Sequence, residues 1–473
     1  MRLSSLLGPD IRQVLKEDPE QLRVLLDELH PEDLADIVSE LEPEEAAELL
    51  ARVPARDAAP IFERLEEHEQ EEIASEMPPE SVAHIASEME ADDRADLLNA
   101  LSEEFGEQVL ENLKRVDPEA AEEVREIESW PDHSAGRLMN PKFVAVSPGM
   151  RVEEALAAIR SHARGNNEFI YTAYALEGDR LVGVISVRDL ILAEPRDRLS
   201  PHLRRNLISV LPTDDQEEVA RKMAKYDLNA IPVMDHRGEI LGIVTIDDAL
   251  DVLTAEQTED VQRLAGIEPL DMPYFKTGFL EFIRKRGVWL VALFLGEFFT
   301  QTALRHYDPV FEAVKGATYY IPLLISAGGN SGSQSSTLII RGMAVGEIRL
   351  QDWWRILIRE LAMGTVLGAI LGAIGFVRVM MYHDQTVGFA LTIALTLIAI
   401  CVTGCTLGAM IPMFLKRLGL DPATSSTPFI ASLVDVVGII VFVQIAKVVL
   451  AKVIAGAGAH AWYGSAGLLP FWT

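Results

Sequence analysis

The sequence has few cysteines and comparatively few basic residues, and both shortages exclude classes of protein. Its 473 residues contain two cysteines, Cys401 and Cys405, too few for a disulfide framework or a four-ligand zinc site. Lysine and arginine number 42 against 72 aspartate and glutamate residues, a net charge of −30. Such an excess of acid repels phosphates and argues against DNA or RNA binding. The N-terminal residues are charged and lack an apolar run, so we expect no secretory signal peptide.

The acidic excess lies entirely in the first 280 residues. They hold 28 basic and 62 acidic side chains, a net charge of −34, whereas residues 281–473 hold 14 and 10, a net charge of +4. A chain of this length predicts two to four domains. Because one half is acidic and the other half carries the apolar mass, a single globular domain is excluded.

Five stretches in the C-terminal half are long and apolar enough to cross a membrane, which takes about 20 mostly apolar residues. They are Gly287–Leu304, Thr318–Ile340, Leu361–Tyr382, Gly388–Leu415 and Phe429–Ala451. One such stretch would also fit a buried core helix. Five in succession, with few charges between them, indicate a polytopic α-helical membrane domain with five spans.

Basic residues near these stretches predict the orientation of the chain. They precede the first stretch and follow the second and the fourth, at Arg284, Lys285, Arg286, Arg341, Arg349, Arg355, Arg359, Lys416 and Arg417. Loops rich in lysine and arginine stay on the cytoplasmic side. We therefore expect the acidic half in the cytoplasm and the C-terminus outside.

Asp435, within the fifth stretch, is the strongest functional clue in the membrane half. A carboxylate deep in a span is costly and marks an ion or proton path, although a structural hydrogen bond or a protonated acid is the competing interpretation. For Glu297, in the first stretch, the structural interpretation is preferred. No lysine or arginine lies deep in a span to neutralise Asp435, since Arg378 and Lys447 are near the ends of their stretches, so we expect a cation. Oxygen ligands such as Asp435, Asn330 and backbone carbonyls suit Mg²⁺, Ca²⁺ or Mn²⁺.

Residues 19–113 repeat with a period of 12. The units begin at Pro19, Pro31, Pro43, Ala55, Glu67, Pro79, Ala91 and Glu103. The seventh, eighth and eleventh positions of each unit are apolar, which is the spacing of one helical face. Proline with acidic residues at the start of a unit is typical of a helix N-terminus. The repeat predicts an all-α superhelical solenoid of short helices within residues 1–130, whose net charge is −27.

Residues 138–253 contain two copies of an α/β unit. Gly183–Leu190 is echoed 59 residues later by Gly242–Ala249. Ser186 and Thr245 occupy helix N-cap positions, with an aspartate three residues later in each copy. The two helices expected upstream are Val152–Ile159 and Glu218–Met223, and the two strands are Phe169–Leu176 and Ala230–Met234.

The echo resembles a tandem of cystathionine-β-synthase (CBS) domains, and the whole chain resembles the MgtE family of bacterial magnesium channels. The most specific parts of the resemblance are Pro322–Gln334 and Pro422–Gly438. It implies four parts: an acidic helical superhelix (1–130), tandem CBS domains (131–253, about 138–200 and 201–253), a connecting helix that plugs the pore (254–280) and a five-helix pore domain (281–473). It also implies a non-enzymatic homodimer in the bacterial inner membrane, with membrane lipid, Mg²⁺ and ATP as its other partners.

The resemblance assigns residues to three kinds of site. In the pore, Asp435 of each subunit would hold hydrated Mg²⁺, with Asn330 and Ala431 lining the path. Regulatory Mg²⁺ would close the channel by binding acidic residues, namely Asp92 and Asp96 facing Asp248, then Asp215, Glu217, Asp227 and Asp251 across the CBS dimer, and Glu256, Glu259 and Asp260 on a connecting helix of roughly Asp251–Phe275. A nucleotide, ATP, would bind at Arg188 and Asp189 with Tyr171 stacking on it.

Other functions remain open at this point. A membrane-anchored CBS regulator that senses nucleotides without its own ion path would leave Asp435 and Asn330 unexplained. A CBS-regulated transporter of another divalent cation fits the same residues. An anion transporter would need basic residues or converging helix N-termini in the membrane, and an enzyme would need a nucleophile–base pair that does not stand out.

Overall fold

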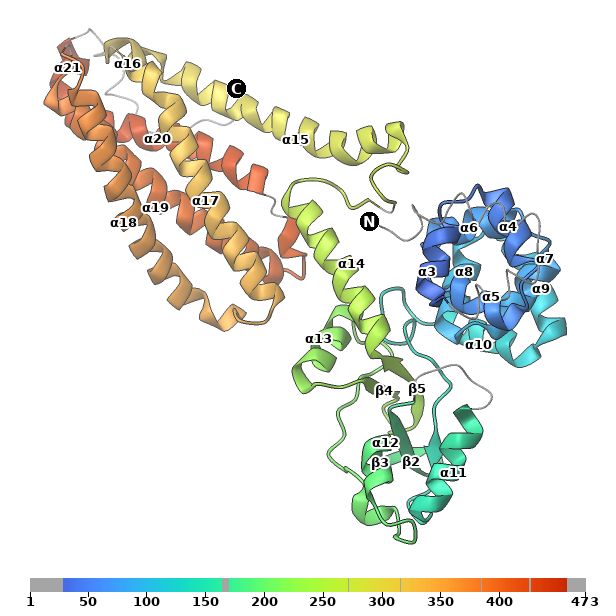
Figure 1. Cartoon of the computed structure of the whole chain (residues 1–473). Helices are drawn as coiled ribbons and strands as arrows, with labels where there is room; N and C mark the ends of the chain where they lie inside the picture. The colour runs from blue at the N-terminus through green and yellow to red at the C-terminus, as the bar shows by residue number, and fades with distance from the viewer. Residues whose placement is uncertain are drawn as a thin grey trace. The chain divides into compact units, whose positions relative to one another are not determined.

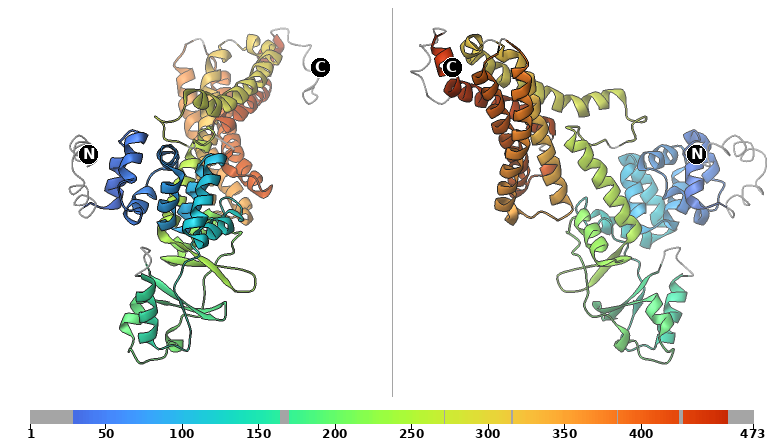
Figure 2. Two further views of the ribbon diagram at one scale, coloured as in Figure 1. Left: turned by 90° about the vertical axis from the view of Figure 1, so that its right-hand side faces the viewer. Right: turned by 60° about the vertical axis from the view of Figure 1, so that its left-hand side comes forward.

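The computed structural model describes residues 29–163, 170–270, 272–314, 316–383, 385–424 and 427–456. The chain forms two compact units, which divide between Glu256 and Gln257. Figures 1 and 2 show the helices and strands of both units. Each unit is considered by itself.

The N-terminal part of the first unit is built from short helices. They are α3 (Pro31–Val38), α4 (Pro43–Leu50), α5 (Ala55–Phe62), α6 (Glu67–Ser75), α7 (Pro79–Glu88), α8 (Ala91–Ala100), α9 (Glu103–Val116) and α10 (Pro118–Glu128). The first seven begin at the predicted unit starts, which confirms the 12-residue repeat. The unit predicted from Pro19 begins outside the described residues.

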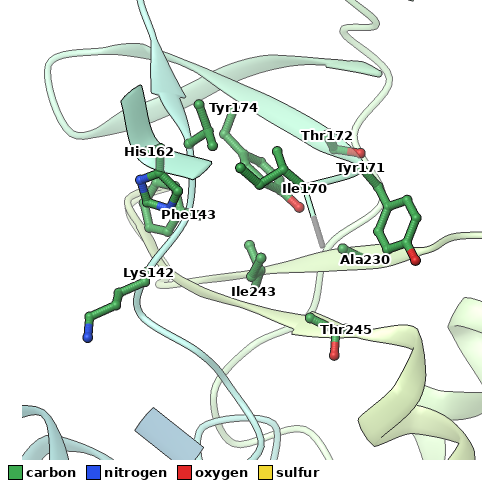
Figure 3. Close-up of a pocket in the computed structure, with 11 residues that line it drawn as sticks. Lys142, Phe143, His162, Ile170, Tyr171, Thr172, Tyr174, Ala230, Ile243 and Thr245 are labelled. Atoms are coloured by element: carbon green, nitrogen blue, oxygen red, sulfur yellow. The ribbon is translucent and has the colours of Figure 1, made fainter. Parts of the chain in front are cut away.

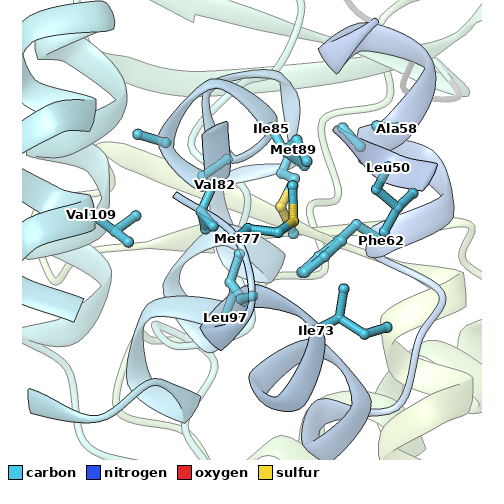
Figure 4. Close-up of a cluster of buried hydrophobic side chains, with 14 of the residues drawn as sticks. Leu50, Ala58, Phe62, Ile73, Met77, Val82, Ile85, Met89, Leu97 and Val109 are labelled. Carbon is cyan, nitrogen blue, oxygen red and sulfur yellow. The ribbon is translucent and has the colours of Figure 1, made fainter. Parts of the chain in front are cut away.

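The repeating apolar positions form one continuous core. Leu50, Phe62, Ile73, Ile85 and Leu97 are all buried, and Figure 4 shows them converging from successive helices. From α3 to α10, each helix packs against the helix two further along the chain. This alternate packing buries the apolar face of every short helix, none of which would be stable in isolation.

The CBS region contains two small sheets. Strand β1 (Ala145–Val146) runs parallel to β2 (Thr172–Glu177), which is antiparallel to β3 (Arg180–Ser186), and β4 (Ala230–Met234) is antiparallel to β5 (Ile240–Thr245). The helices are α11 (Val152–Ala163), α12 (Val187–Leu192), η1 (Ser200–His202), α13 (Gln216–Tyr226) and α14 (Ile246–Leu264). The predicted strand over Ala230–Met234 and both upstream helices are confirmed. The first predicted strand begins at Thr172 within the described residues; its predicted start, Phe169, lies outside them.

Both copies of the sequence echo have the expected strand-to-helix junction. The hydroxyl of Ser186 accepts a hydrogen bond from the backbone N–H of Asp189 at 3.0 Å, as predicted for an N-cap. At Thr245 the Asp248 carboxylate instead accepts from the backbone N–H and the hydroxyl of that threonine. Gly242 has a packing reason, because a Cβ there would lie 2.7 Å from the carbonyl oxygen of Asn140. The echo therefore marks tertiary contacts as well as local structure.

The connecting helix differs from the prediction of roughly Asp251–Phe275. Helix α14 begins at Ile246, directly after β5, and ends at Leu264. Gly266 then adopts a positive φ of 73°, and Pro269 and Pro273 follow, so the helix cannot continue. Phe275 lies in a turn outside the helix.

The second unit is dominated by long apolar helices. They are α15 (Phe279–His306), α17 (Ile321–Ala344), α18 (Trp353–Met380), α19 (Val387–Arg417) and α20 (Thr427–Val449). Between and after them lie α16 (Asp308–Ala313), η2 (Ala317–Tyr320), η3 (Leu350–Asp352), η4 (Pro422–Thr424) and α21 (Ala451–Gly456). Within the described residues, four helices are long and apolar enough to cross a membrane, namely those that contain α15, α18, α19 and α20. The second predicted span corresponds to α17, which is 24 residues long but is not among the four.

Close helix contacts hold this unit together. Helix α19 packs against α17 and α18, and α17 also packs against α20 (Figures 1 and 2). A Cβ added at Gly408 of α19 would lie 2.1 Å from the carbonyl oxygen of Gly332 of α17. Small residues at such crossings let helix backbones approach within a membrane. This contact joins α17 to α19, and α17 packs against α20 as well.

Candidate cation-binding sites

The three predicted pore residues lie on the adjacent helices α17 and α20. Asp435 is half-buried on α20, and a Cβ built at Gly329 of α17 would lie 3.9 Å from its Oδ1 atom and 3.3 Å from the Cβ of Ala431. Asn330 follows Gly329 and is exposed, with its Nδ2 donating to the Ser326 hydroxyl at 3.3 Å. The absence of a side chain at Gly329 keeps the space beside Asp435 open. One carboxylate and the Ala431 segment thus lie next to Gly329, and Asn330 is the next residue along α17.

A second carboxylate, Glu297 of α15, lies beside the same stretch of α20. Its Oε1 accepts a hydrogen bond from the Ser432 hydroxyl at 2.7 Å, and it is near enough to Asp435 to interact with it electrostatically. The hydrogen bond is the structural role that the sequence suggested for Glu297. Glu297 is thus a second carboxyl group close to the predicted pore residue Asp435.

Glu360 of α18 is a buried acid that sequence reasoning missed. Its Oε2 accepts a hydrogen bond from the Ser335 hydroxyl of α17 at 2.6 Å, and the residue is 5% exposed. The predicted span began at Leu361, whereas α18 begins at Trp353. Arg355 and Arg359 lie in the first two turns of α18, and this charge excluded them, and with them Glu360, from the predicted span.

In the first unit, Asp92 and Asp93 of α8 lie against Asp248 of α14. Asp92 is 5% exposed, and its Oδ1 has no hydrogen-bond partner within the described part of the chain. Burial, reinforced by the charge of Asp248, raises the pKa of Asp92 well above its usual range. Burial raises the pKa of Asp93 well above normal too, with Glu63 and then Asp248 adding to the effect. Burial raises the pKa of Asp248 to about 6.

Asp96, predicted to face Asp248, lies in a different environment. Its carboxylate is 3.9 Å from a guanidinium nitrogen of Arg137. Loss of solvent raises the pKa of Asp96 to about 6, and Arg137 opposes the rise. The side chain nevertheless remains 62% exposed, so this shift carries little energy. Glu90, in contrast, is a neighbour that the sequence did not suggest; it accepts a hydrogen bond from Asn140 at 3.2 Å.

The remaining predicted regulatory acids are dispersed along α13 and α14. Asp215 caps α13 by accepting from the backbone N–H of Glu217 at 3.0 Å, Glu217 itself pairs with Arg221, and Asp227 is exposed at the end of that helix. Along α14, burial raises the pKa of Asp251, and Glu256 accepts a hydrogen bond from Gln216 at 2.8 Å.

The last two predicted regulatory acids, Glu259 and Asp260, differ from the others because both interact with Arg263. Its guanidinium pairs with Glu259 and with Asp421, and the charge of Asp260 also acts on it. Glu259 therefore has a cation partner supplied by the chain itself. Among the described residues, no three side chains of the His, Cys, Asp and Glu types are arranged to hold a metal ion.

A pocket opens between the two CBS repeats (Figure 3). It encloses about 320 Å³, including space open to solvent, and Tyr171, for which the resemblance implies nucleotide stacking, lies on its wall. Arg188 is exposed on α12, and Asp189 accepts a hydrogen bond from Arg204 at 3.0 Å; neither lines this pocket. Lining residues that sequence reasoning missed are Lys142, Phe143, His162, Tyr174 and Thr245. Of these five residues, only Thr245 could be singled out from the sequence, because it is the counterpart of Ser186 in the second copy of the repeated unit.

Comparisons with known proteins match three parts of this architecture. The family model described as MgtE intracellular N domain matches residues 29–133, the CBS domain model matches 135–196 and 200–255, and the MgtE model, described as a divalent cation transporter, matches 321–445. The magnesium transporter MgtE of Thermus thermophilus is 40% identical over 339 residues, which cover 72% of this chain and 75% of the relative. The chain belongs to the MgtE family. It is therefore a transporter and not an enzyme, and its N-terminal helical domain is intracellular.

Two solved structures resemble the cytoplasmic part of this MgtE family member. One, the soluble part of a magnesium transporter, is 30% identical with a TM-score of 0.50 and covers 54% of this chain and 99% of that chain. The other is the cytosolic domain of the Mg²⁺ channel MgtE in complex with ATP, 39% identical with a TM-score of 0.48, covering 52% of this chain and all of that one.

Proposed function

We propose that this MgtE family member is a homodimeric, Mg²⁺-selective channel for magnesium uptake that closes when Mg²⁺ binds its acidic cytoplasmic domains. The observation that supports the ion path is the packing of Gly329 of α17, which precedes Asn330, against Ala431 and Asp435 of α20. The magnesium transporters among its relatives support the choice of ion. A transporter of another divalent cation is the alternative that uses the same residues.

In this proposal helix α17 also spans the membrane, as the second of five spans along the chain. At about 1.5 Å per residue its 24 residues extend about 36 Å, which exceeds the roughly 30 Å hydrocarbon core. It is less apolar than the other four because glycine, serine and asparagine occupy Gly328–Gln334. Such residues are tolerated in a bilayer where they face protein or water. We place the pore between α17 and α20 of two subunits, with the N-terminus in the cytoplasm of a bacterial cell and the C-terminus outside.

The sparse ligand set suits an ion that keeps its water. Mg²⁺ dehydrates reluctantly and usually retains several waters when a protein binds it. Asp435 would supply charge, and the Asn330 amide and the Ala431 carbonyl would accept hydrogen bonds from bound water. Two copies of Asp435 at a two-fold axis would match the charge of one divalent cation.

The acidic cluster of Asp92, Asp93 and Asp248 is our proposed principal sensor. At neutral pH the ionised carboxylates repel one another across the contact between α8 and α14. Mg²⁺ would neutralise them and hold the helical and CBS domains together. The other assigned acids, Asp96, Asp215, Glu217, Asp227, Asp251, Glu256, Glu259 and Asp260, would contribute at the borders of this contact or between subunits.

The domain division predicted from the sequence remains our proposal, with the pore domain beginning near residue 281. We also propose that ATP binds the CBS pair, with Tyr171 stacking on the base and Lys142, whose ammonium group lies 3.3 Å from Glu123, moving to the phosphates. Arg188 and Asp189, at the matching junction of the first repeat, would serve the ribose. Isothermal titration of the full chain with ATP, compared with Y171A, tests this assignment.

The decisive experiment for the pore is Asp435→Asn. Asparagine preserves the shape of the side chain and removes its charge, so Mg²⁺ uptake into proteoliposomes should fall by at least about tenfold while the dimer persists. Glu360→Gln is the matched control, since it makes the same chemical change at an acid that is buried against Ser335, whereas Asn330 is exposed. Normal uptake by the Asp435 variant would refute the pore assignment.

A further inference from the structure

The segment from Tyr274 to Arg286, at the start of the first span, combines exposed aromatic residues with exposed arginines. Phe275 is 97% exposed, and Phe279 and Leu280 are each 79% exposed. Arg284 and Arg286 are also exposed, and within the described residues neither has a carboxylate at ion-pair distance. Neither the proposed pore nor the proposed sensor uses these side chains.

The segment has a defined shape. The Thr277 hydroxyl is hydrogen-bonded to the carbonyl oxygens of Met272 and Pro273 at 3.1 and 3.0 Å, which closes the turn that carries Phe275. The ring of Tyr274 packs edge-on against Phe282, with centroids 4.9 Å apart. Lys285 donates to the carbonyl oxygen of Pro269 at 2.6 Å and so ties the preceding loop to α15. The exposed aromatic side chains are therefore held in place beside the arginines.

Helix length leaves part of α15 outside the hydrocarbon core of a membrane. The 28 residues of α15 extend about 42 Å, whereas the hydrocarbon core is about 30 Å thick. About eight residues lie outside the core, and the span predicted from the sequence begins at Gly287. Phe279–Arg286 are the eight residues before it, on the side of the intracellular domain. Aromatic rings favour the headgroup level, and arginines there attract anionic lipid.

We propose that Tyr274–Arg286 is a binding site for acidic phospholipid of the cytoplasmic leaflet. Phe275, Phe279 and Leu280 pack among the lipid headgroups, and Arg284 and Arg286, nearer the hydrocarbon core, bind the lipid phosphate. Bound lipid fixes the junction between the chain's cytoplasmic and membrane parts. The inference is independent of which cation the protein carries.

Native mass spectrometry of the full-length protein, titrated with phosphatidylglycerol or phosphatidylcholine, tests the site. Wild type should bind phosphatidylglycerol more tightly, and R284Q/R286Q should weaken that binding by roughly 25-fold, since each basic side chain contributes about fivefold. R284K/R286K should retain it. The matched control is K416Q/R417Q, which removes two exposed basic residues from the end of α19.

Three results would overturn the proposal. Equal losses in R284Q/R286Q and K416Q/R417Q would mean that only overall charge matters. Equal affinity of wild type for the two lipids would mean that no acidic-lipid site exists. A change in the oligomeric state of F279S, with lipid preference unaltered, would show that a second copy of the chain covers the aromatic residues. If R284Q/R286Q cannot be purified, the single variants R284Q and R286Q should each lose about fivefold.

Discussion

Removing the charge of Asp248 should strengthen the contact between α8 and α14 when Mg²⁺ is absent. The pKa of Asp248 rises from an ordinary 3.8 to about 6 in the folded protein. That difference corresponds to about 3 kcal/mol of disfavoured ionisation, and allowing for the solvent that reaches this half-buried side chain leaves about 1 to 3 kcal/mol. Asp248→Asn keeps the shape of the neutral acid. The Mg²⁺-free contact should therefore be favoured by up to about 150-fold over wild type, less the part of the pKa shift that Asp247 and Asp251 of α14 itself supply.

The same contact should respond to pH in the direction that the acids dictate. An acid whose pKa is higher in the packed state stabilises packing when it is protonated, and this contribution disappears as the pH rises from about 4 to about 6. Asp92, Asp93, Asp247 and Asp251 all face or flank Asp248 and add to the repulsion of its charged form. Without Mg²⁺, wild type should be more protected at pH 5 than at pH 7.5. Asp248→Asn should reduce that difference.

Hydrogen exchange in the full-length protein measures both effects. Peptides from Ala91–Ala100 and from the first half of α14 should exchange more slowly in Asp248→Asn than in wild type at pH 7.5 without Mg²⁺, and adding Mg²⁺ should slow wild type more than the variant. The control is Asp179→Asn, which removes one exposed charge in the turn between β2 and β3. Unchanged or faster exchange in Asp248→Asn would refute the electrostatic account, because it would mean that the carboxylate makes a favourable contact.

Three further substitutions test helix packing, a buried arginine and an ion pair. Gly408→Ala should lower the thermal unfolding temperature of the membrane part, because the new Cβ would clash with Gly332 at a cost of about 1–3 kcal/mol or more. Gly287→Ala is the control, because a Cβ there meets open space and should leave the unfolding temperature unchanged. Arg94→Met should destabilise the helical domain by about 3–5 kcal/mol, seen as faster proteolysis of α7–α10, because it leaves Glu123 and three carbonyl oxygens without their buried donor. Arg263→Gln should raise the Mg²⁺ concentration needed to stop flux a few-fold without reducing maximal flux, because it cuts the ion pair with Asp421.

The local parts of the fold were predictable and the nonlocal parts were not. Seven helices begin where the 12-residue repeat placed them, because proline, acidic first turns and apolar spacing are signals carried within each unit. The prediction ends the connecting helix at Phe275, eleven residues beyond the end of α14 at Leu264. Gly266 and Pro269 are helix-ending signals, but the acidic pattern along α14 favoured a longer helix. A helix boundary depends on a few residues, whereas a periodic pattern averages over many.

The candidate sites show the same division. Asp435 could be singled out because a lone carboxylate in an apolar run is conspicuous in the sequence itself. The partners of the other acids could not be found in this way: Asp189 pairs with Arg204, fifteen residues away, and Glu259 shares Arg263 with Asp421, which is 162 residues from Glu259. Whether an acid is free to respond to a cation depends on such pairs. They arise from tertiary packing and leave no periodic trace.

Ion pairs within the chain distinguish acids that would respond strongly to an added cation from acids that would respond weakly. Arg94 meets Glu123, and Arg263 meets Glu259 and Asp421, so these carboxylates already have a permanent counter-ion. The strongest charged influences on Asp92 are Asp248, Asp93 and Glu90, all of the same sign. A cluster that its own chain leaves uncompensated must take up a proton, separate, or bind an external cation. Mg²⁺ sensitivity should therefore be lost when Asp92 and Asp248 are both changed to asparagine, and largely kept when Glu259 is changed to glutamine.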